Sequence, residues 1–402
     1  MLRNRGLFAL LLAEVVSTTG SMMTWLALPW FVLSTTGSAS RMGIVLAAEA
    51  LGVATFGIPG GHLAARLGAR RTMVVVNAIA GPAILLIPLL HRAGLLSFWL
   101  LVVIVFAIGG LFGPYFASQR VVLVEILGED ESKVSGANAW LQGATRITML
   151  IGPPLAGVLI TLIGAPAVLV VDAATFLFAL VVIGLFVPRG KPIEETDEAA
   201  EGVFAGIRYL GHNRLLLAWT VSMALGDAAW NALFATLPFY AFTEYDGNAK
   251  VAGILFACFG VAAVVGNVAS FRVRKRMEPA TLIAVFVIAQ AIPLWLLVGA
   301  GSAGWIAAAL LLAGFANGIV NPSLHAFLTL IVPPAVRSQA LTSVLAINQL
   351  AAPLGFVGGG LILAHGGFRP VFVLVATVQM LTMGARAIST LRQRDAIPVT
   401  AS

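Results

Sequence analysis

Five ionisable side chains lie inside long apolar runs of this 402-residue chain: Glu14, Glu49, Arg146, Asp172 and Asp227. A charged group in hydrocarbon is costly unless it is paired or reaches a water-filled cavity, so each of the five is a functional candidate. A carboxyl group in apolar surroundings can take up and release a proton near neutral pH. The pattern therefore favours proton transfer over covalent chemistry.

Depth along the expected helices separates the five residues. At 1.5 Å per residue, Glu14 lies about 10 Å into the first apolar run and Asp227 about 20 Å into the seventh, and both are candidate proton carriers. A carboxylate hydrogen-bonded between helices is the alternative for each. Glu49 and Arg146 both fall near the midplane, so we expect a pair that either fixes helix packing or neutralises Glu49 during turnover. Asp172 follows a helix start, where the dipole favours a carboxylate, and a structural role is expected.

The composition requires a membrane. The chain is 59% hydrophobic and 10% charged, with a mean hydropathy of +0.98, far from a soluble globular protein. Twelve apolar runs are long enough to cross a bilayer. We therefore expect an all-α membrane protein with twelve transmembrane helices, at residues 7–33, 42–64, 72–91, 97–124, 134–162, 166–187, 214–242, 251–271, 280–299, 303–331, 338–364 and 368–388.

Lysine and arginine divide unequally between the two sides of these helices. With both termini on one side, nineteen of the 24 lie on that side, Arg386 among them, and one, Arg146, is in the membrane. The four on the other side are Arg41, Arg92, Lys250 and Arg369. The positive-inside rule then predicts a multi-pass protein of the inner (cytoplasmic) cell membrane with both termini cytoplasmic, and it argues against nucleic-acid binding. The single cysteine, Cys258, excludes an intramolecular disulfide and is expected to pack in the core.

The chain divides into two similar halves. Asn4 precedes Pro29 by 25 residues, and Asn213 precedes Pro238 by the same 25. A polar stretch near the middle has the composition of a flexible linker. We expect a six-helix bundle at 1–187, a cytoplasmic linker at 188–212, a second six-helix bundle at 213–390 and a tail at 391–402. Parallel six-helix repeats place a substrate site at the interface of the halves.

The loop between the second and third expected helices carries a recognisable motif. GHLAARLGARR, from Gly61 to Arg71, resembles the major facilitator superfamily signature G-x-L-A-D-R-x-G-R-R, matching it at Gly61, Leu63, Ala64, Arg66, Gly68, Arg70 and Arg71. Ala65 replaces the family's aspartate, which there joins a charge network that holds the cytoplasmic side closed. We expect Glu125, at the inner end of the fourth helix, to substitute by pairing with Arg66 or Arg70.

The fifth expected helix carries a second motif. GATRITMLIGPPLAG is similar to the antiporter signature of drug exporters in this superfamily, with matches at Gly143, Gly152, Pro153, Ala156 and Gly157. Residues 20–29 and 171–173 look like the branch that contains macrolide-efflux and enterobactin-exporter-type proteins. In that branch the position of Ser21 is often aspartate.

The resemblance implies a central cavity lined by the first and seventh helices, which would hold Glu14 and Asp227 and makes these two residues the leading proton carriers. Aromatic faces with few polar groups suit bulky amphipathic or cationic compounds. The side chains expected to bind substrate, each of which could instead only pack against a neighbour, are Trp25, Tyr115, Gln119, Trp230, Asn231, Phe234, Asn317, Asn321 and His325.

These observations predict a secondary active, proton-coupled exporter of hydrophobic drugs or secondary metabolites, and hence antibiotic resistance by multidrug efflux. The alternatives are a dedicated exporter of a siderophore or lipid-like metabolite, or a proton-coupled symporter. The chain lacks a P-loop motif, so a gradient must supply the energy. Neither a nucleophile-base constellation nor a metal-ligand cluster supports a lipid-modifying enzyme, and the chain shows no large soluble domain for a sensor. We expect a monomer without cofactor or metal.

Overall fold

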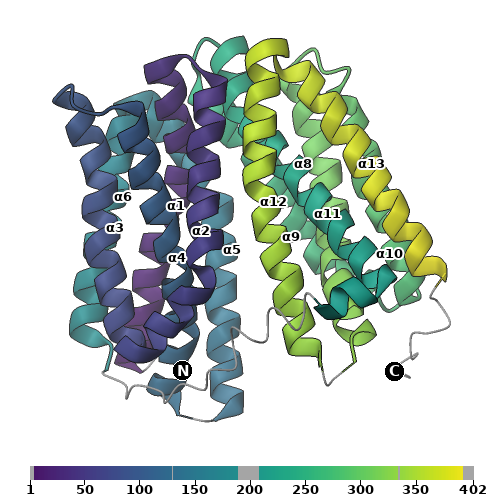
Figure 1. Ribbon diagram of the computed structural model, residues 1–402, viewed down its shortest axis with the longest axis horizontal. Coiled ribbons are helices and arrows are strands. Elements are labelled where there is room, and N and C mark those ends of the chain that lie inside the picture. Colours follow the sequence, from purple (N-terminus) through teal and green to yellow (C-terminus); the bar gives the residue numbers. More distant parts are fainter. Residues whose placement is uncertain (1–3, 129, 189–207, 334–335, 393–402) are drawn as a thin grey trace. The chain divides into compact units, whose positions relative to one another are not determined.

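The computed structural model describes residues 4–128, 130–188, 208–333 and 336–392. Within these ranges it contains twelve α-helices of at least 13 residues, a short helical stretch at residues 208–212, one 3-10 helix and no strand (Figure 1). The helices are α1 (Arg5–Thr36), α2 (Ala39–Leu67), α3 (Ala69–Arg92), α4 (Phe98–Leu127), α5 (Glu131–Ile163), α6 (Ala165–Phe186), α8 (Arg214–Glu244), α9 (Ala249–Val273), α10 (Pro279–Ala291) with η1 (Ile292–Leu297), α11 (Ala303–Ile331), α12 (Arg337–Gly366) and α13 (Phe368–Arg392).

Eleven helices in the described part of the chain are long and apolar enough to cross a membrane. The exception among the twelve predicted spans is α8, which carries Asp227 and Asn231 near its middle. An all-α fold with membrane-length helices confirms the predicted fold class. The sidedness of the termini stays a prediction.

The helices form two compact units, and the division between them does not fall at the linker alone. The first comprises Met1–Asp197 and Ala241–Gly253, and the second comprises Glu198–Tyr240 and Ile254–Ser402. The end of α8 and the start of α9 therefore belong to the first unit. The predicted domain boundaries at residues 187 and 213 stay predictions.

Glycines let helix backbones touch inside the first unit. A Cβ at Gly109 of α4 would collide with the carbonyl oxygen of Glu49 on α2, and one at Gly52 of α2 would collide with that of Phe106 on α4. Small residues at such crossings replace side-chain packing by direct backbone contact. The α2–α4 pair therefore sets the position of Glu49.

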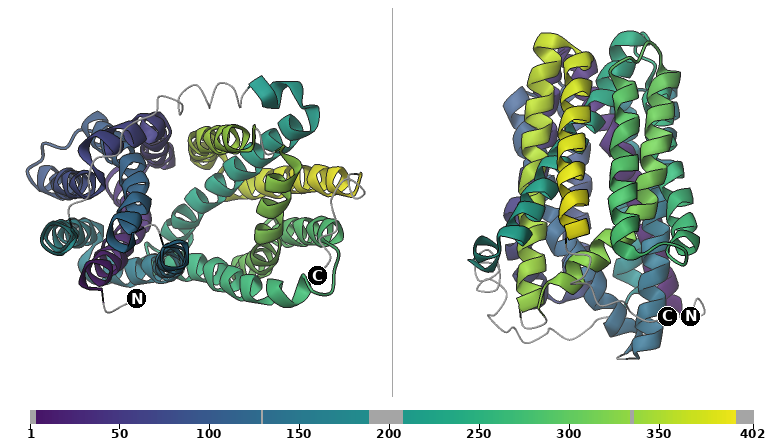
Figure 2. Two further views of the ribbon diagram at one scale, coloured as in Figure 1. Left: turned by 90° about the horizontal axis from the view of Figure 1, so that it is seen from below. Right: turned by 90° about the vertical axis from the view of Figure 1, so that its right-hand side faces the viewer.

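The second unit repeats this construction, and the helices within each unit run alongside one another (Figure 2). A Cβ at Gly266 of α9 would collide with the carbonyl oxygen of Phe315 on α11. A Cβ at Gly318 of α11 would likewise collide with the carbonyl oxygen of Ala263 on α9. In each expected repeat, the second and fourth helices thus pack through contacts between glycines and the backbone of the facing helix. Similarly, Gly355 of α12 lies against α8 at the carbonyl oxygen of Ala228, beside Asp227.

Candidate functional site

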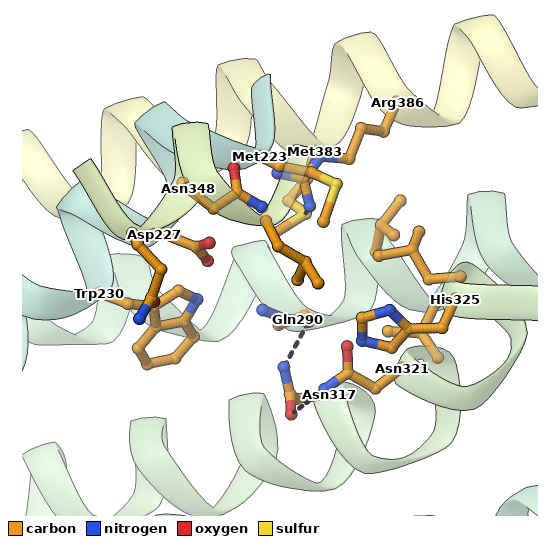
Figure 3. Close-up of a pocket in the computed structure, with 16 residues that line it drawn as sticks. Met223, Asp227, Trp230, Gln290, Asn317, Asn321, His325, Asn348, Met383 and Arg386 are labelled. Carbon is orange, nitrogen blue, oxygen red and sulfur yellow. Dashed lines mark hydrogen bonds between the residues drawn. The ribbon is translucent and has the colours of Figure 1, made fainter. Parts of the chain in front are cut away.

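A polar cavity of about 280 Å³ lies inside the second unit. Its lining comes from α8, α10, α11, α12 and α13, and Figure 3 shows the side chains that face it. Asp227 and Trp230 lie toward one side, and Asn321 and His325 lie toward the other. The predicted residues Asp227, Trp230, Asn317, Asn321 and His325 are therefore brought together.

An aromatic cavity of about 360 Å³ adjoins the polar one. The two share five lining residues, Asp227, Trp230, Asn317, Asn348 and Gln349. Trp230 stacks on Phe234 with ring centroids 5.5 Å apart, and its ring lies 5.0 Å from that of Phe259. Asp227 therefore lines both the aromatic cavity and the polar cavity.

Side-chain amides connect the helices around the polar cavity. Asn317 donates to the carbonyl oxygen of Gln290 at 3.4 Å, and Asn321 donates to that of Asn317 at 3.5 Å (Figure 3). Asn231 donates to the Asp227 backbone carbonyl at 2.8 Å. Asn348, which the sequence reasoning missed, is buried, and its Oδ1 has no hydrogen-bond partner in the described part of the chain. That oxygen is therefore an unsatisfied acceptor in the wall that the two cavities share.

Arg386 is a second lining residue that the sequence reasoning missed. Its Nε donates to Ser222 Oγ at 3.1 Å and its Nη2 to the Ser222 carbonyl at 2.7 Å, and the side chain is 5% exposed. Counting it among the cytoplasmic charges was wrong, because α13 continues to Arg392 and turns this position toward α8. An arginine inside the apolar run of the last helix was the available signal.

Glu14, in the first unit, is 3% exposed and hydrogen-bonded. The Tyr115 hydroxyl donates to its Oε1 at 2.7 Å, and the Gln119 side chain is a further hydrogen-bond partner. Glu14, expected to carry a proton, thus shares one hydrogen-bond network across α1 and α4 with Tyr115 and Gln119, which were expected to bind substrate. Trp25 lies half-buried on α1, outside the lining of the two cavities in the second unit.

Asp172 is fully buried and is held by threonines. Thr24 on α1 donates to its Oδ2 at 2.5 Å, and Thr175 donates to its Oδ1 at 3.1 Å. The expected dipole contact is wrong, because α6 begins at Ala165 and has no acidic residue in its first turn. The hydrogen bonds nevertheless fit the structural role expected for Asp172, since they join α1 to α6.

The expected pairing of Glu49 with Arg146 is not observed. Both residues lie in the described part of the chain, yet no ion pair joins them, and Arg146 is exposed on α5. The charged group that acts on Glu49 is Asp172. Equal depth in the membrane does not fix the direction in which a side chain leaves its helix, and α5 turns Arg146 outward with its exposed neighbour Ile147.

The loop motif shows a different pattern of contacts from the one expected. Gly68 has a positive φ of 81° and caps α3, and Arg70 donates to the Ile183 carbonyl at 3.4 Å and to that of Gly184, near the end of α6. Both carboxylate oxygens of Glu125 are buried without a hydrogen-bond partner among the described residues. The predicted Glu125–Arg70 pair is therefore absent. Gly61 lies in the last turns of α2, and Arg66 and Arg71 are exposed.

The glycines of the fifth-helix motif pack against other backbones. A Cβ at Gly152 would collide with the Met22 side chain on α1. A Cβ at Gly157 would lie 2.7 Å from the Ala249 carbonyl oxygen, and one at Gly253 would lie 2.8 Å from that of Pro153. The motif therefore lies where α5 meets α1 and the start of α9.

A bundle of membrane-length helices with cavities lined by sparse polar and ionisable groups is typical of a multi-pass membrane transporter. The chain belongs to the Major Facilitator Superfamily, whose family model matches residues 10–335 and 243–396.

Several relatives share nearly the whole chain. The multidrug efflux pump Tap of Mycolicibacterium fortuitum is 22% identical over 399 residues, which cover 97% of this chain and 96% of the pump. The uncharacterised transporter y4rN of Sinorhizobium fredii is 25% identical over 409 residues, which cover 98% of this chain and 96% of that transporter. The solved structure of the nucleoside transporter NupG has a TM-score of 0.75 at 13% identity, covering 95% of this chain and 98% of that one. A POT-family transporter in complex with 5-aminolevulinic acid has a TM-score of 0.73 at 14% identity, covering 98% and 97%. The last two share the fold.

Proposed function

We propose that this protein is a secondary active exporter of hydrophobic or amphipathic drugs or secondary metabolites, working by proton antiport and alternating access. It would act as a monomer in the inner cell membrane. The similarity to the multidrug efflux pump Tap supports drug efflux. The observation that carries the proposal is the position of Asp227, which lies between the aromatic cavity and the polar cavity.

Asp227 would serve both the substrate and the proton. An ionised carboxylate beside stacked aromatic rings attracts an amine or delocalised cation, and the rings add cation–π attraction. A proton on the same carboxyl group removes that attraction, so loading of the proton and loading of the substrate oppose each other. Opposed loading at one group couples the two movements as an exchange when the empty transporter does not change its orientation. Glu14, held by Tyr115 in the first unit, would provide a second proton site.

The test is transport by purified protein in liposomes with an imposed pH gradient, screened over dyes, antibiotics and siderophores. We expect Asp227→Asn to lower proton-driven transport at least about tenfold, the effect of losing roughly 1.4 kcal/mol of differential binding. Asp246→Asn is the matched control, because Asp246 is exposed and has a φ of 48° that asparagine also adopts readily.

The same assay separates the alternatives. Movement of siderophores alone would indicate a dedicated exporter, and co-migration of substrate with protons would indicate a symporter. If Asp227→Asn transported every substrate at the wild-type rate under a pH gradient, the assigned role of Asp227 would be wrong. Wild-type protein that moved neither compounds nor protons would refute the exporter.

A further inference from the structure

Arg386 is a buried cation with unused hydrogen-bonding capacity. Its guanidinium donates twice to Ser222 and makes a long contact of 3.7 Å with the Met383 sulfur. A guanidinium carries five N–H donors, so two remain without an acceptor among the described residues. Since Arg386 lines the polar cavity, a ligand there can reach the cation.

The local structure holds this cation in place. Ser222 of α8 accepts hydrogen bonds from Nε of the guanidinium with its side chain and from Nη2 with its backbone carbonyl. A Cβ at Gly226 would lie 3.1 Å from Nη2, so the glycine leaves the room that the group needs. The cation is thus fixed against the segment of α8 that ends at Asp227.

Asp227 and Arg386 give the polar cavity two charges of opposite sign that remain apart. They act on each other electrostatically, but in the described part of the chain they make no ion-pair contact. Figure 3 shows the two side chains apart, with Met223 and Met383 near the arginine. His325 is the remaining titratable side chain in the lining. Each charge therefore retains room for a partner of its own.

Given the export function proposed above, we propose that the cavity selects zwitterionic aromatic compounds, with a cationic group at Asp227 and a carboxylate at Arg386. The aromatic body of the substrate would lie against Trp230, Phe234 and Phe259. A purely cationic compound neutralises Asp227 but leaves a buried arginine that repels it, which is costly in a low-dielectric site. A zwitterion neutralises both charges, and its carboxylate fits the paired donors of a guanidinium.

Two fluorescent dyes test the proposal: a cationic rhodamine methyl ester and the zwitterionic rhodamine that differs from it only in its free carboxylate. Binding is measured in detergent by fluorescence polarisation, and export is measured in liposomes. We expect the wild-type protein to bind the zwitterion more tightly. Arg386→Gln should weaken zwitterion binding about tenfold or more, the typical effect of losing a hydrogen bond to a charged group, and leave ester binding unchanged or tighter.

The controls separate recognition from folding. Arg369→Gln changes an exposed arginine on the same helix and should alter neither dye. Arg386→Lys keeps the charge without the planar fork and should retain part of the preference. Tighter or equal binding of the ester by the wild-type protein would overturn the proposal, and this comparison needs no variant to fold. If folded Arg386→Gln bound both dyes equally more weakly, the arginine would have only a structural role between α13 and α8, and the proposal would be wrong. If the zwitterion binds preferentially but is not exported, the assignment of the cavity stands and the exporter fails.

Discussion

Tyr115 gives Glu14 a defined partner, which makes the role of this carboxylate testable without disturbing the fold. In Glu14→Gln the side-chain carbonyl can still accept the Tyr115 hydrogen bond, while the proton-binding carboxylate is lost. We expect a folded protein whose export no longer responds to a pH gradient, measured as dye release from liposomes.

Tyr115→Phe is the matched control for this prediction. It removes the same hydrogen bond but keeps the carboxyl group, so gradient-driven export should persist at a lower rate. Unchanged gradient-driven export in Glu14→Gln would show that the first unit carries no essential proton there.

Asp227, Trp230, Asn231 and Phe234 follow helical spacing, so their position on one face of α8 is a property of the sequence itself. Their roles in proton coupling and substrate binding stay predictions. Sequence reasoning failed where rotation about a helix axis decides the contact. Depth placed Arg146 level with Glu49, but nothing local indicates which way an apolar helix turns a given side chain, and the same ambiguity hid Arg386.

At the scale of elements, glycine contacts determine how closely α5 approaches α1. A Cβ at Gly152 would come within 3.1 Å of the Met22 backbone carbonyl carbon, whereas Gly143 on the same helix has open space around it. We expect Gly152→Leu to destabilise the protein by about 1–3 kcal/mol through overpacking. The measurement is thermal unfolding in detergent.

Gly143→Leu introduces the same side chain into the same helix and serves as the control. Its melting temperature should stay near that of the wild-type protein. Equal losses in the two variants would mean that leucine on α5 is harmful in general and that the α1–α5 contact has no special importance.

Helix lengths and the repeated halves were predictable because apolar runs and their spacing are properties of the sequence itself. The crossings between helices were not, since Gly109 against Glu49 and Gly318 against Ala263 require partners far apart in the chain. Among the glycines at helix crossings, the sequence marked only those of the fifth-helix motif, because a family pattern includes them.

For the whole molecule, the distribution of charge predicts that both termini face the cytoplasm. Without the buried Arg386, eighteen lysines and arginines lie on the expected cytoplasmic side and four on the other, so the asymmetry remains. Tags at both ends should resist a protease applied to intact cells and be cut in inverted membrane vesicles. A tag after Asn248, between α8 and α9, should behave in the opposite way. Identical accessibility of all three positions would contradict the topology.

Cys258 lies half-buried on α9, directly before Phe259 of the aromatic cavity. Since it is the chain's one cysteine, a thiol-reactive fluorophore will mark a single position without any engineered substitution. The natural sequence thus supplies a spectroscopic reporter beside the proposed substrate chamber, and ligand occupancy becomes readable as a change in emission of the unmutated protein.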